Sequence, residues 1–126
     1  FSLEDIWFNY YIDGEYQEEH LHINSSPFLP PVHFSCVHYL KYDEEEHVST
    51  TFHDPISTLR CHSFEIDSNH YTSEWTPKVK EGDLLIFPSY LVHHVRKSKP
   101  TPNNPRITVA FNLRLLSYGD EGKDQL

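Results

Sequence analysis

Short runs of alternating residues, separated by turn residues, most constrain the fold of this 126-residue chain. Alternation with a period of two is typical of β-strands, and the chain has almost none of the 3.6-residue periodicity that predicts helices. Strands are predicted over residues 7–12, 15–23, 32–42, 48–52, 61–66, 84–87, 92–96 and 106–116. This pattern predicts an all-β fold with few or no helices, in which the strands form a sandwich or a jelly-roll barrel.

The turn between the first two runs predicts how they are joined. Asp13-Gly14 is a strong signal for a two-residue hairpin loop, so we expect these runs to pair with each other. His20 and His22 then belong to a strand, where side chains two residues apart share a face and lie about 6.6 Å apart along the backbone. The two imidazoles can therefore converge on one metal ion.

A third histidine, His93, closes the apolar run that follows Gly82. His93 and His94 point to opposite faces of a strand, so only one of them can face the interior. Three histidines with open coordination positions would form a mononuclear site of the non-haem iron type. The alternative is a solvent-facing polar stripe, because the chain contains 10 histidines.

The last run has two different faces. One face carries Ile107, Val109, Phe111, Leu113 and Leu115, and the other carries Arg106, Thr108, Ala110, Asn112 and Arg114. Large aromatic residues are mostly buried, so we expect Trp7, Tyr39 and Phe111 to belong to the core rather than to contact a substrate.

Length, composition and charge restrict the class of protein. A chain of 126 residues with 37% hydrophobic content predicts one domain over residues 1–126, with a loose polar tail at 117–126. The formal net charge of -9 disfavours nucleic acid and anionic membranes as partners. No apolar segment approaches a membrane span, and we expect a cytoplasmic protein.

The cysteines and the first residue complete the composition. Cys36 and Cys61 are too few for a disulfide framework or a metal-binding cysteine cluster, so we expect two free thiols in a reducing compartment. The chain starts at Phe1 and contains no methionine, so we expect its natural start to be missing. A homodimer is compatible with the sequence.

Two fragments match the metal-binding signature of cupins. They are Gly14-x5-His20-x-His22 and Gly82-x5-Pro88-x4-His93. The chain lacks the glutamate that cupins place after the paired histidines, and Tyr90 stands where cupins usually have glycine. The site therefore resembles a cupin site only in part.

The chain more closely resembles a group of iron(II)- and 2-oxoglutarate-dependent oxygenases from phages and marine bacteria, which share the double-stranded β-helix with cupins. The matching pieces are Trp7, Asn9 and residues 20–22, 35–40, 52–55, 85–95 and 106–112. The resemblance spans nearly the whole chain, and its last two pieces are the most specific.

This resemblance implies roles for individual residues. It makes His20 the first iron ligand and His93 the distal histidine, because His93-His94-Val95 fits the family's His-x-Val. It makes Arg106 the partner of the distal carboxylate of 2-oxoglutarate, a task that suits a guanidinium fork, and adds a hydroxyl donor from Thr108. Most such oxygenases have a carboxylate where this chain has His22.

The third metal ligand is therefore left open between His22 and Asp54, which lies in the Phe52-His53-Asp54-Pro55 match. Asp54 before a proline is also typical of a turn residue that caps its own backbone. We expect Fe(II) as the metal, while a purified sample could instead hold Ni or Zn.

These observations predict an Fe(II)/2-oxoglutarate-dependent dioxygenase that hydroxylates an unknown small-molecule or peptide substrate. Residues 24–31 and 57–75 are expected to gather at the open end of the barrel and set its specificity. One alternative is a cupin-type enzyme with the same three histidines and no keto acid. The other is a non-enzymatic β-sandwich module for binding or structure, such as a phage component.

Overall fold

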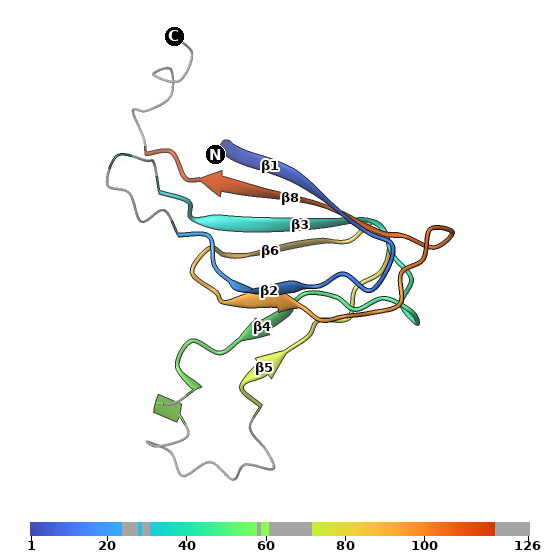
Figure 1. Cartoon of the computed structure of the whole chain (residues 1–126). Helices are drawn as coiled ribbons and strands as arrows, with labels where there is room; N and C mark the ends of the chain where they lie inside the picture. The colour runs from blue at the N-terminus through green and yellow to red at the C-terminus, as the bar shows by residue number, and fades with distance from the viewer. Residues whose placement is uncertain (24–27, 29–30, 58, 61–71, 118–126) are drawn as a thin grey trace.

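The computed structural model describes residues 1–23, 28, 31–57, 59–60 and 72–117. The described residues form two four-stranded antiparallel sheets that face each other (Figure 1). The first sheet has the order β1-β8-β3-β6 and the second the order β2-β7-β4-β5. The strands are β1 Ser2–Tyr11, β2 Gln17–His20, β3 Phe34–Lys41, β4 Thr51–His53, β5 Glu74–Trp75, β6 Leu84–Pro88, β7 His93–Val95 and β8 Arg106–Arg114. The prediction of an all-β, two-layer fold is confirmed.

The first sheet holds the long strands, and its inner face is polar. Along β8 the buried residues are Arg106, Thr108, Ala110 and Asn112. The apolar face of the same strand is half-exposed, and across it on β1 the side chains of Ile6 and Phe8 are 60% and 69% exposed. Phe111 lies on this outer face, so the prediction that it is a core residue is wrong. A polar inner face is unusual for a sandwich and indicates a site between the sheets.

The expected hairpin between the first two runs does not form. Strand β1 pairs with β8, whereas β2 pairs with β7 in the other sheet. Gly14 has φ of 65°, and the Glu15 carboxylate accepts the backbone N–H groups of Ile12 and Asp13 at 2.9 and 2.7 Å. This turn carries the chain from one sheet to the other. The long β1 finds a partner along its whole length in β8, and this pairing outweighs the local turn signal.

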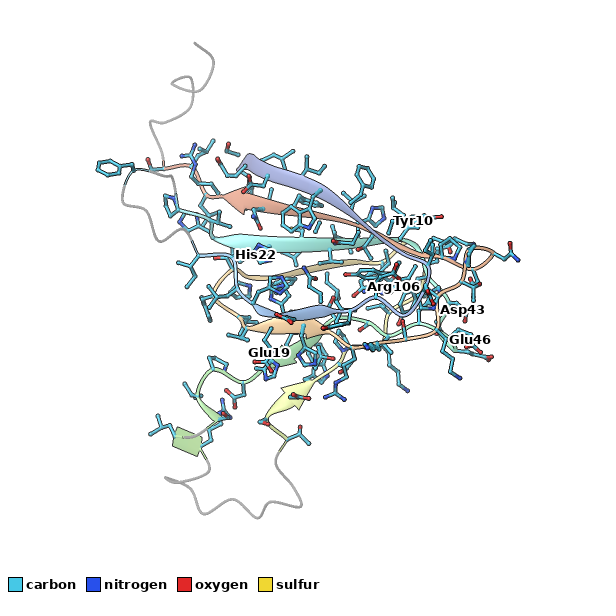
Figure 2. The ribbon with its side chains drawn as sticks, in the orientation of Figure 1. Tyr10, Glu19, His22, Asp43, Glu46 and Arg106 are labelled. Carbon is cyan, nitrogen blue, oxygen red and sulfur yellow. The ribbon has the colours of Figure 1, made fainter. Side chains whose placement is uncertain are left out.

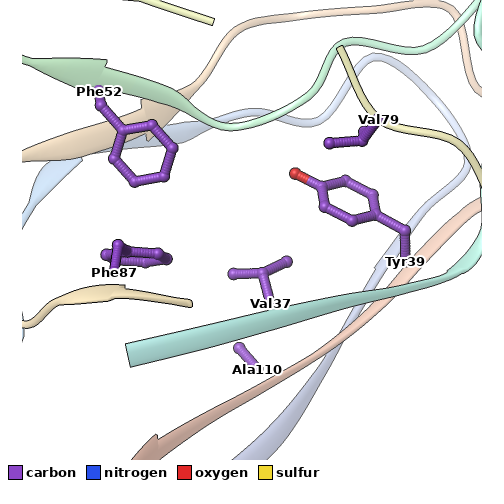
Figure 3. Close-up of a cluster of buried hydrophobic side chains, with 6 residues drawn as sticks. All are labelled: Val37, Tyr39, Phe52, Val79, Phe87 and Ala110. Carbon is purple, nitrogen blue, oxygen red and sulfur yellow. The ribbon is translucent and has the colours of Figure 1, made fainter. Parts of the chain in front are cut away.

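The hydrophobic core lies between the sheets beside the polar inner face (Figure 3). Its buried members are Val37, Tyr39, Phe52, Val79, Phe87 and Ala110. Tyr39 is fully buried, and its hydroxyl bonds Thr50 Oγ1 at 2.9 Å and accepts the Thr50 N–H at 3.0 Å. Tyr39 is thus a core residue, as predicted, and Trp7 packs against the cluster while partly buried.

Several strand boundaries differ from the prediction. β1 starts earlier, and β5 was not predicted. The run at 48–52 becomes the short β4, because Ser49 and Thr50 bond to other groups: Ser49 Oγ donates to the Pro77 carbonyl at 2.7 Å. The predicted strand at 61–66, Cys61 and the tail after residue 117 lie outside the described residues.

Two further expectations concern Cys36 and membrane spans. Cys36 is a free, buried thiol whose pKa is raised by burial, as expected for an unpaired structural cysteine. Within the described residues no helix is long and apolar enough to cross a membrane.

Candidate metal centre

His20, His22 and His93 converge between the two sheets. Their ring centroids lie 4.2 Å apart for His20 and His93, 5.0 Å for His20 and His22, and 5.1 Å for His22 and His93. One nitrogen from each ring lies within 4.8 Å of the others. Figure 2 shows His22 in the space between the sheets. The structure therefore brings together the three histidines that the sequence singled out.

Short strands of the second sheet place these rings. His20 is the last residue of β2 and pairs with His93, the first residue of β7. His22 lies two residues beyond β2, where its backbone N–H donates to the Ser89 carbonyl at 3.0 Å. His93 faces the interior, while His94 lies on the other side of the strand, as the alternation predicted.

The hydrogen bonds of two rings fix which nitrogen is free. His20 Nδ1 lies 2.7 Å from the Glu18 carbonyl, and His93 Nδ1 lies 2.8 Å from the Leu91 carbonyl. A carbonyl only accepts, so Nδ1 of each ring must carry the proton and donate. In the neutral imidazole this leaves Nε2 as a free lone pair, which is the form that metal-binding histidines take.

Burial keeps His93 and His22 uncharged. Burial lowers the pKa of His93 to about 4; the bond to the Leu91 carbonyl opposes this shift, and the charges of His20 and His22 add to it. Burial, followed by the charge of His20, also lowers the pKa of His22, whereas Asp5 opposes the shift. Metal ions bind neutral imidazole, so at neutral pH both rings are ready to act as ligands.

Aromatic side chains surround the histidines. Trp7 stacks on His22 with centroids 5.3 Å apart and planes at 24°, and Phe87 meets the His93 ring at 4.9 Å and 67°. These contacts restrict the imidazole orientations and give the centre a partly apolar wall. Trp7 thus belongs both to the edge of the core and to the site, which the sequence did not reveal.

Arg106 is buried in the same space, with 1% of its surface exposed. Its Nε donates to the Val48 carbonyl at 3.0 Å, and its guanidinium lies 5.0 Å from the Tyr11 ring centroid and 5.4 Å from that of Tyr39. No acidic side chain among the described residues pairs with it. A buried charge without a counter-ion is costly, so this arrangement favours an anionic ligand.

Thr108 is the neighbour of Arg106 on the inner face of β8. It is 1% exposed, and its Oγ1 accepts a hydrogen bond from Asn9 Nδ2 at 3.3 Å. Because Asn9 supplies the donor, the Thr108 hydroxyl hydrogen remains for another acceptor. Arg106 and Thr108 thus present donors to the same cavity.

One cavity connects the histidines with these donors. The empty space in it, counted together with open solvent at its mouth, is about 360 Å³. Figure 2 shows Arg106, like His22, between the two sheets. The cavity is lined by Trp7, Asn9, Tyr11, Gln17, His20, His22, Ser35, Cys36, Val37, Thr50, Phe87, His93, Val95, Arg106, Thr108 and Ala110.

Asp54 lies away from this centre. It follows β4, where its carboxylate pairs with Arg60 Nε at 3.1 Å and accepts the Ile56 N–H at 3.0 Å. The histidine cluster does not include it. Asp54 therefore has the geometry of a turn residue that caps its own backbone, which was the alternative to a metal ligand.

Tyr11 and Tyr39 are site residues that the sequence did not indicate. Tyr11 pairs with Arg106 across β1 and β8, and burial raises its pKa, with the Arg106 charge opposing. Only the register between β1 and β8, at opposite ends of the chain, brings Tyr11 next to Arg106. No local pattern in the sequence carries that information.

Comparisons with known proteins identify a family and two similar folds. The model of the family described as "Putative 2OG-Fe(II) oxygenase" matches residues 5–112. A 2OG-Fe(II) oxygenase family oxidoreductase from Burkholderia pseudomallei is similar in structure, with a TM-score of 0.61 and 14% identity over 88% of this chain and 43% of that chain. A prolyl-4-hydroxylase from Pseudomonas putida has a TM-score of 0.59 and 18% identity over 89% of this chain and 52% of that chain. No curated protein sequence matches the chain.

The chain spans about half the length of these two solved structures. At such identities the likeness shows the fold, and it confirms the predicted jelly roll, the double-stranded β-helix. The family model extends from β1 through nearly all of β8 and contains the three histidines, Arg106 and Thr108. The chain therefore belongs to the 2OG-Fe(II) oxygenase family.

Proposed function

We propose that this chain is an Fe(II)/2-oxoglutarate-dependent dioxygenase that hydroxylates an organic substrate. The observation that carries the proposal is one cavity that holds three converging imidazoles and a buried guanidinium without an acidic partner among the described residues. The first feature suits a metal, and the second suits a carboxylate. Family membership supplies the link between the two.

The donor set fits iron(II). His20, His22 and His93 would bind it through neutral nitrogens, since imidazole suits iron and the hydrogen bonds leave Nε2 free on two of the rings. We prefer His22 to Asp54 as third ligand, because Asp54 is held by Arg60 outside the cluster. Nickel or zinc could take the same three nitrogens in a purified sample.

Arg106 and Thr108 would anchor the distal carboxylate of the keto acid. The Arg106 Nε is already bonded to Val48, so its two terminal nitrogens are left to form charge-assisted hydrogen bonds. The rings of Tyr11 and Tyr39 beside the guanidinium hold it in place before any ligand arrives. Preorganisation of this kind lowers the entropic cost of binding.

The other residues of the cavity would orient the ligands and limit water. Bound iron(II) would supply the redox chemistry that couples decarboxylation of 2-oxoglutarate to oxidation of the substrate. Trp7 and Phe87 pack on two of the imidazoles and keep water from that side of the centre. Because three neutral ligands leave the charge of the ion uncompensated, the site would attract a dianionic co-substrate strongly.

The substrate is proposed only as a class, a small molecule or a peptide. One structural neighbour is a prolyl-4-hydroxylase, which fits a substrate with a hydroxylatable C–H bond near an amide. Nucleic acid is disfavoured, because the formal net charge is -9. Most of the segments expected to set specificity, 24–31 and 57–75, lie outside the described residues.

Among the described residues no carboxylate joins the histidine cluster, and this favours one second candidate. A dioxygenase with three histidine ligands and no keto acid would need the metal centre but not Arg106. Replacing Arg106 would then leave the reaction of the metal-loaded protein unchanged. The buried, unpaired Arg106 is the reason to rank this candidate second.

The test is anaerobic addition of 2-oxoglutarate to the iron-loaded chain, followed by exposure to air. We expect a visible absorption band on chelation of the keto acid and succinate after oxygen is admitted. A chain that binds iron but gives neither band nor succinate would support the keto-acid-independent alternative. A chain that binds no iron at all would contradict both.

A further inference from the structure

A second group of metal-binding side chains lies on the opposite side of the second sheet. His53 on β4 follows the buried Phe52, His94 on β7 follows the buried His93, and the exposed Glu19 on β2 precedes His20. All three side chains face outward. Figure 2 shows Glu19 on the side of this sheet away from His22. The group is separate from the three histidines of the cavity and shares no residue with them.

The three side chains are close enough to share one ion. His53 Nε2 lies 2.8 Å from His94 Nδ1 and 3.5 Å from Glu19 Oε1. One ligand atom from each residue lies within 4.8 Å of the others. His53 and His94 are half-buried on the sheet surface, and the Glu19 side chain is exposed beside them.

Glu74 on β5 supports one of these histidines from behind. Its Oε1 lies 3.8 Å from His53 Nδ1, on the far side of the ring from Nε2. A carboxylate that faces the second nitrogen of a ligating imidazole is the usual outer partner in zinc sites, where it fixes the tautomer and raises the basicity of the ligand. The arrangement thus has a ligand set and a carboxylate that faces the second nitrogen of one ligand.

We propose that Glu19, His53 and His94 form a second metal site that binds zinc(II), with water in the remaining position. Two imidazoles and one carboxylate are ligands that zinc accepts in a tetrahedral site. The proposal does not depend on the function assigned to the cavity. It predicts two metal ions for each chain, one on either face of the second sheet.

Zinc must displace two existing hydrogen bonds, one from Arg96 to His94 and one between His94 and His53. Arg96 Nε donates to His94 Nε2 at 3.2 Å, so His94 carries its proton on Nδ1 and donates it to His53 Nε2. To bind zinc through Nδ1, neutral His94 must move that proton to Nε2, and the Arg96 side chain must release the ring. No proton leaves the protein, and Arg96 keeps its second partner, Glu74.

The bound ion would cross-link three strands of one sheet. β2, β7 and β4 are short and adjacent, and they carry His20 and His93 on their inner side. A zinc ion on the outer side would stabilise the register of these strands and thereby the positions of the cavity ligands. We therefore assign it a structural role.

The experiment titrates metal-free, tag-free protein with cobalt(II), followed by its visible absorption, and then displaces the cobalt with zinc(II). We expect two equivalents for the wild-type chain, one for His53→Ala/His94→Ala and one for His20→Ala/His93→Ala. His38→Ala on the other sheet is the matched control and should keep two. Circular dichroism checks that each variant is folded.

Single substitutions test the individual roles. Glu74→Gln should weaken zinc at this site by roughly 10- to 100-fold, as loss of an outer partner does elsewhere. Arg96→Ala should tighten it, because it removes both a positive charge and the competing bond to His94. The proposal would be overturned if the folded His53→Ala/His94→Ala variant still bound two equivalents of metal. It would also be overturned if the wild-type chain bound one equivalent and this variant bound one as well. This comparison decides the question even if the variant of the cavity histidines fails to fold.

Discussion

Replacing Arg106 by methionine should weaken 2-oxoglutarate binding by about two orders of magnitude and leave iron binding intact. Methionine keeps much of the length and apolar character of the side chain, so the cavity stays filled while the charge is removed. The guanidinium Nε is bonded to the Val48 carbonyl, so the terminal nitrogens can make two bonds to a carboxylate. At roughly 1.5 kcal/mol for each charge-assisted bond, the loss is about 3 kcal/mol.

This loss corresponds to an increase of about 150-fold in the Kd of 2-oxoglutarate, at about 1.4 kcal/mol for each factor of ten. The assay is an anaerobic titration of the iron-loaded protein with 2-oxoglutarate, followed by its visible absorption. Iron content is measured in the same samples. Because Arg106 contacts none of the three histidines, the iron content should equal that of the wild-type protein.

Arg114→Met is the matched control. Arg114 lies on the same strand, and its Nε pairs with Glu4 at 2.9 Å, outside the residues that line the cavity. It should bind 2-oxoglutarate as the wild type does. A folded, iron-loaded Arg106→Met protein whose Kd stays within about threefold of the wild-type value would refute the anchoring role.

Three further predictions concern the site and the core. His22→Ala should lower iron affinity, while His22→Asp should restore it, because a carboxylate is also a good iron ligand. The assay is the iron content of each variant. Equal affinity of the wild type and His22→Ala would exclude His22 as a ligand. In the metal-free chain the pKa of His93 falls from 6.5 to about 4 on folding. The neutral His93 ring therefore contributes fully to the free energy of unfolding above pH 6.5, and this contribution is lost as the pH falls toward 4. The total loss is about 3 kcal/mol. Urea unfolding at pH 7 and pH 4.5 should show this loss, and His93→Gln should show less of it. Tyr39→Phe leaves the buried Thr50 N–H without its partner, so it should cost roughly 1–3 kcal/mol of unfolding free energy. Tyr10→Phe at an exposed position should cost almost nothing. Equal urea midpoints for the two variants would contradict the stabilising role of the Tyr39 hydroxyl.

The sequence allowed the strand content and the inward histidines to be predicted, because both follow from alternation with a period of two. His93 and His94 show this most clearly, since strand geometry alone assigns them to opposite faces. Which strands pair with each other could not be predicted from the sequence. β1 is joined to β2 by a turn of the hairpin type, yet it pairs with β8 from the other end of the chain.

The surroundings of the candidate ligands also depend on register. The resemblance named Arg106, but the rings of Tyr11 and Tyr39 reach it only through the alignment of β1, β3 and β8. The outer group of Glu19, His53 and His94 depends in the same way on how β2, β7 and β4 are aligned. Pairwise long-range alignment of this kind leaves no local trace in a single sequence.

The bonds from His20 and His93 to backbone carbonyls two residues earlier in the chain have a consequence for how the centre tolerates substitutions. Each ring is held by the residue two positions before it, through a backbone atom that every amino acid possesses. Substitution of Glu18 or Leu91 by most other residues therefore leaves the orienting acceptor in place. The local backbone therefore orients both histidines, and the surrounding side chains are free to vary with the substrate.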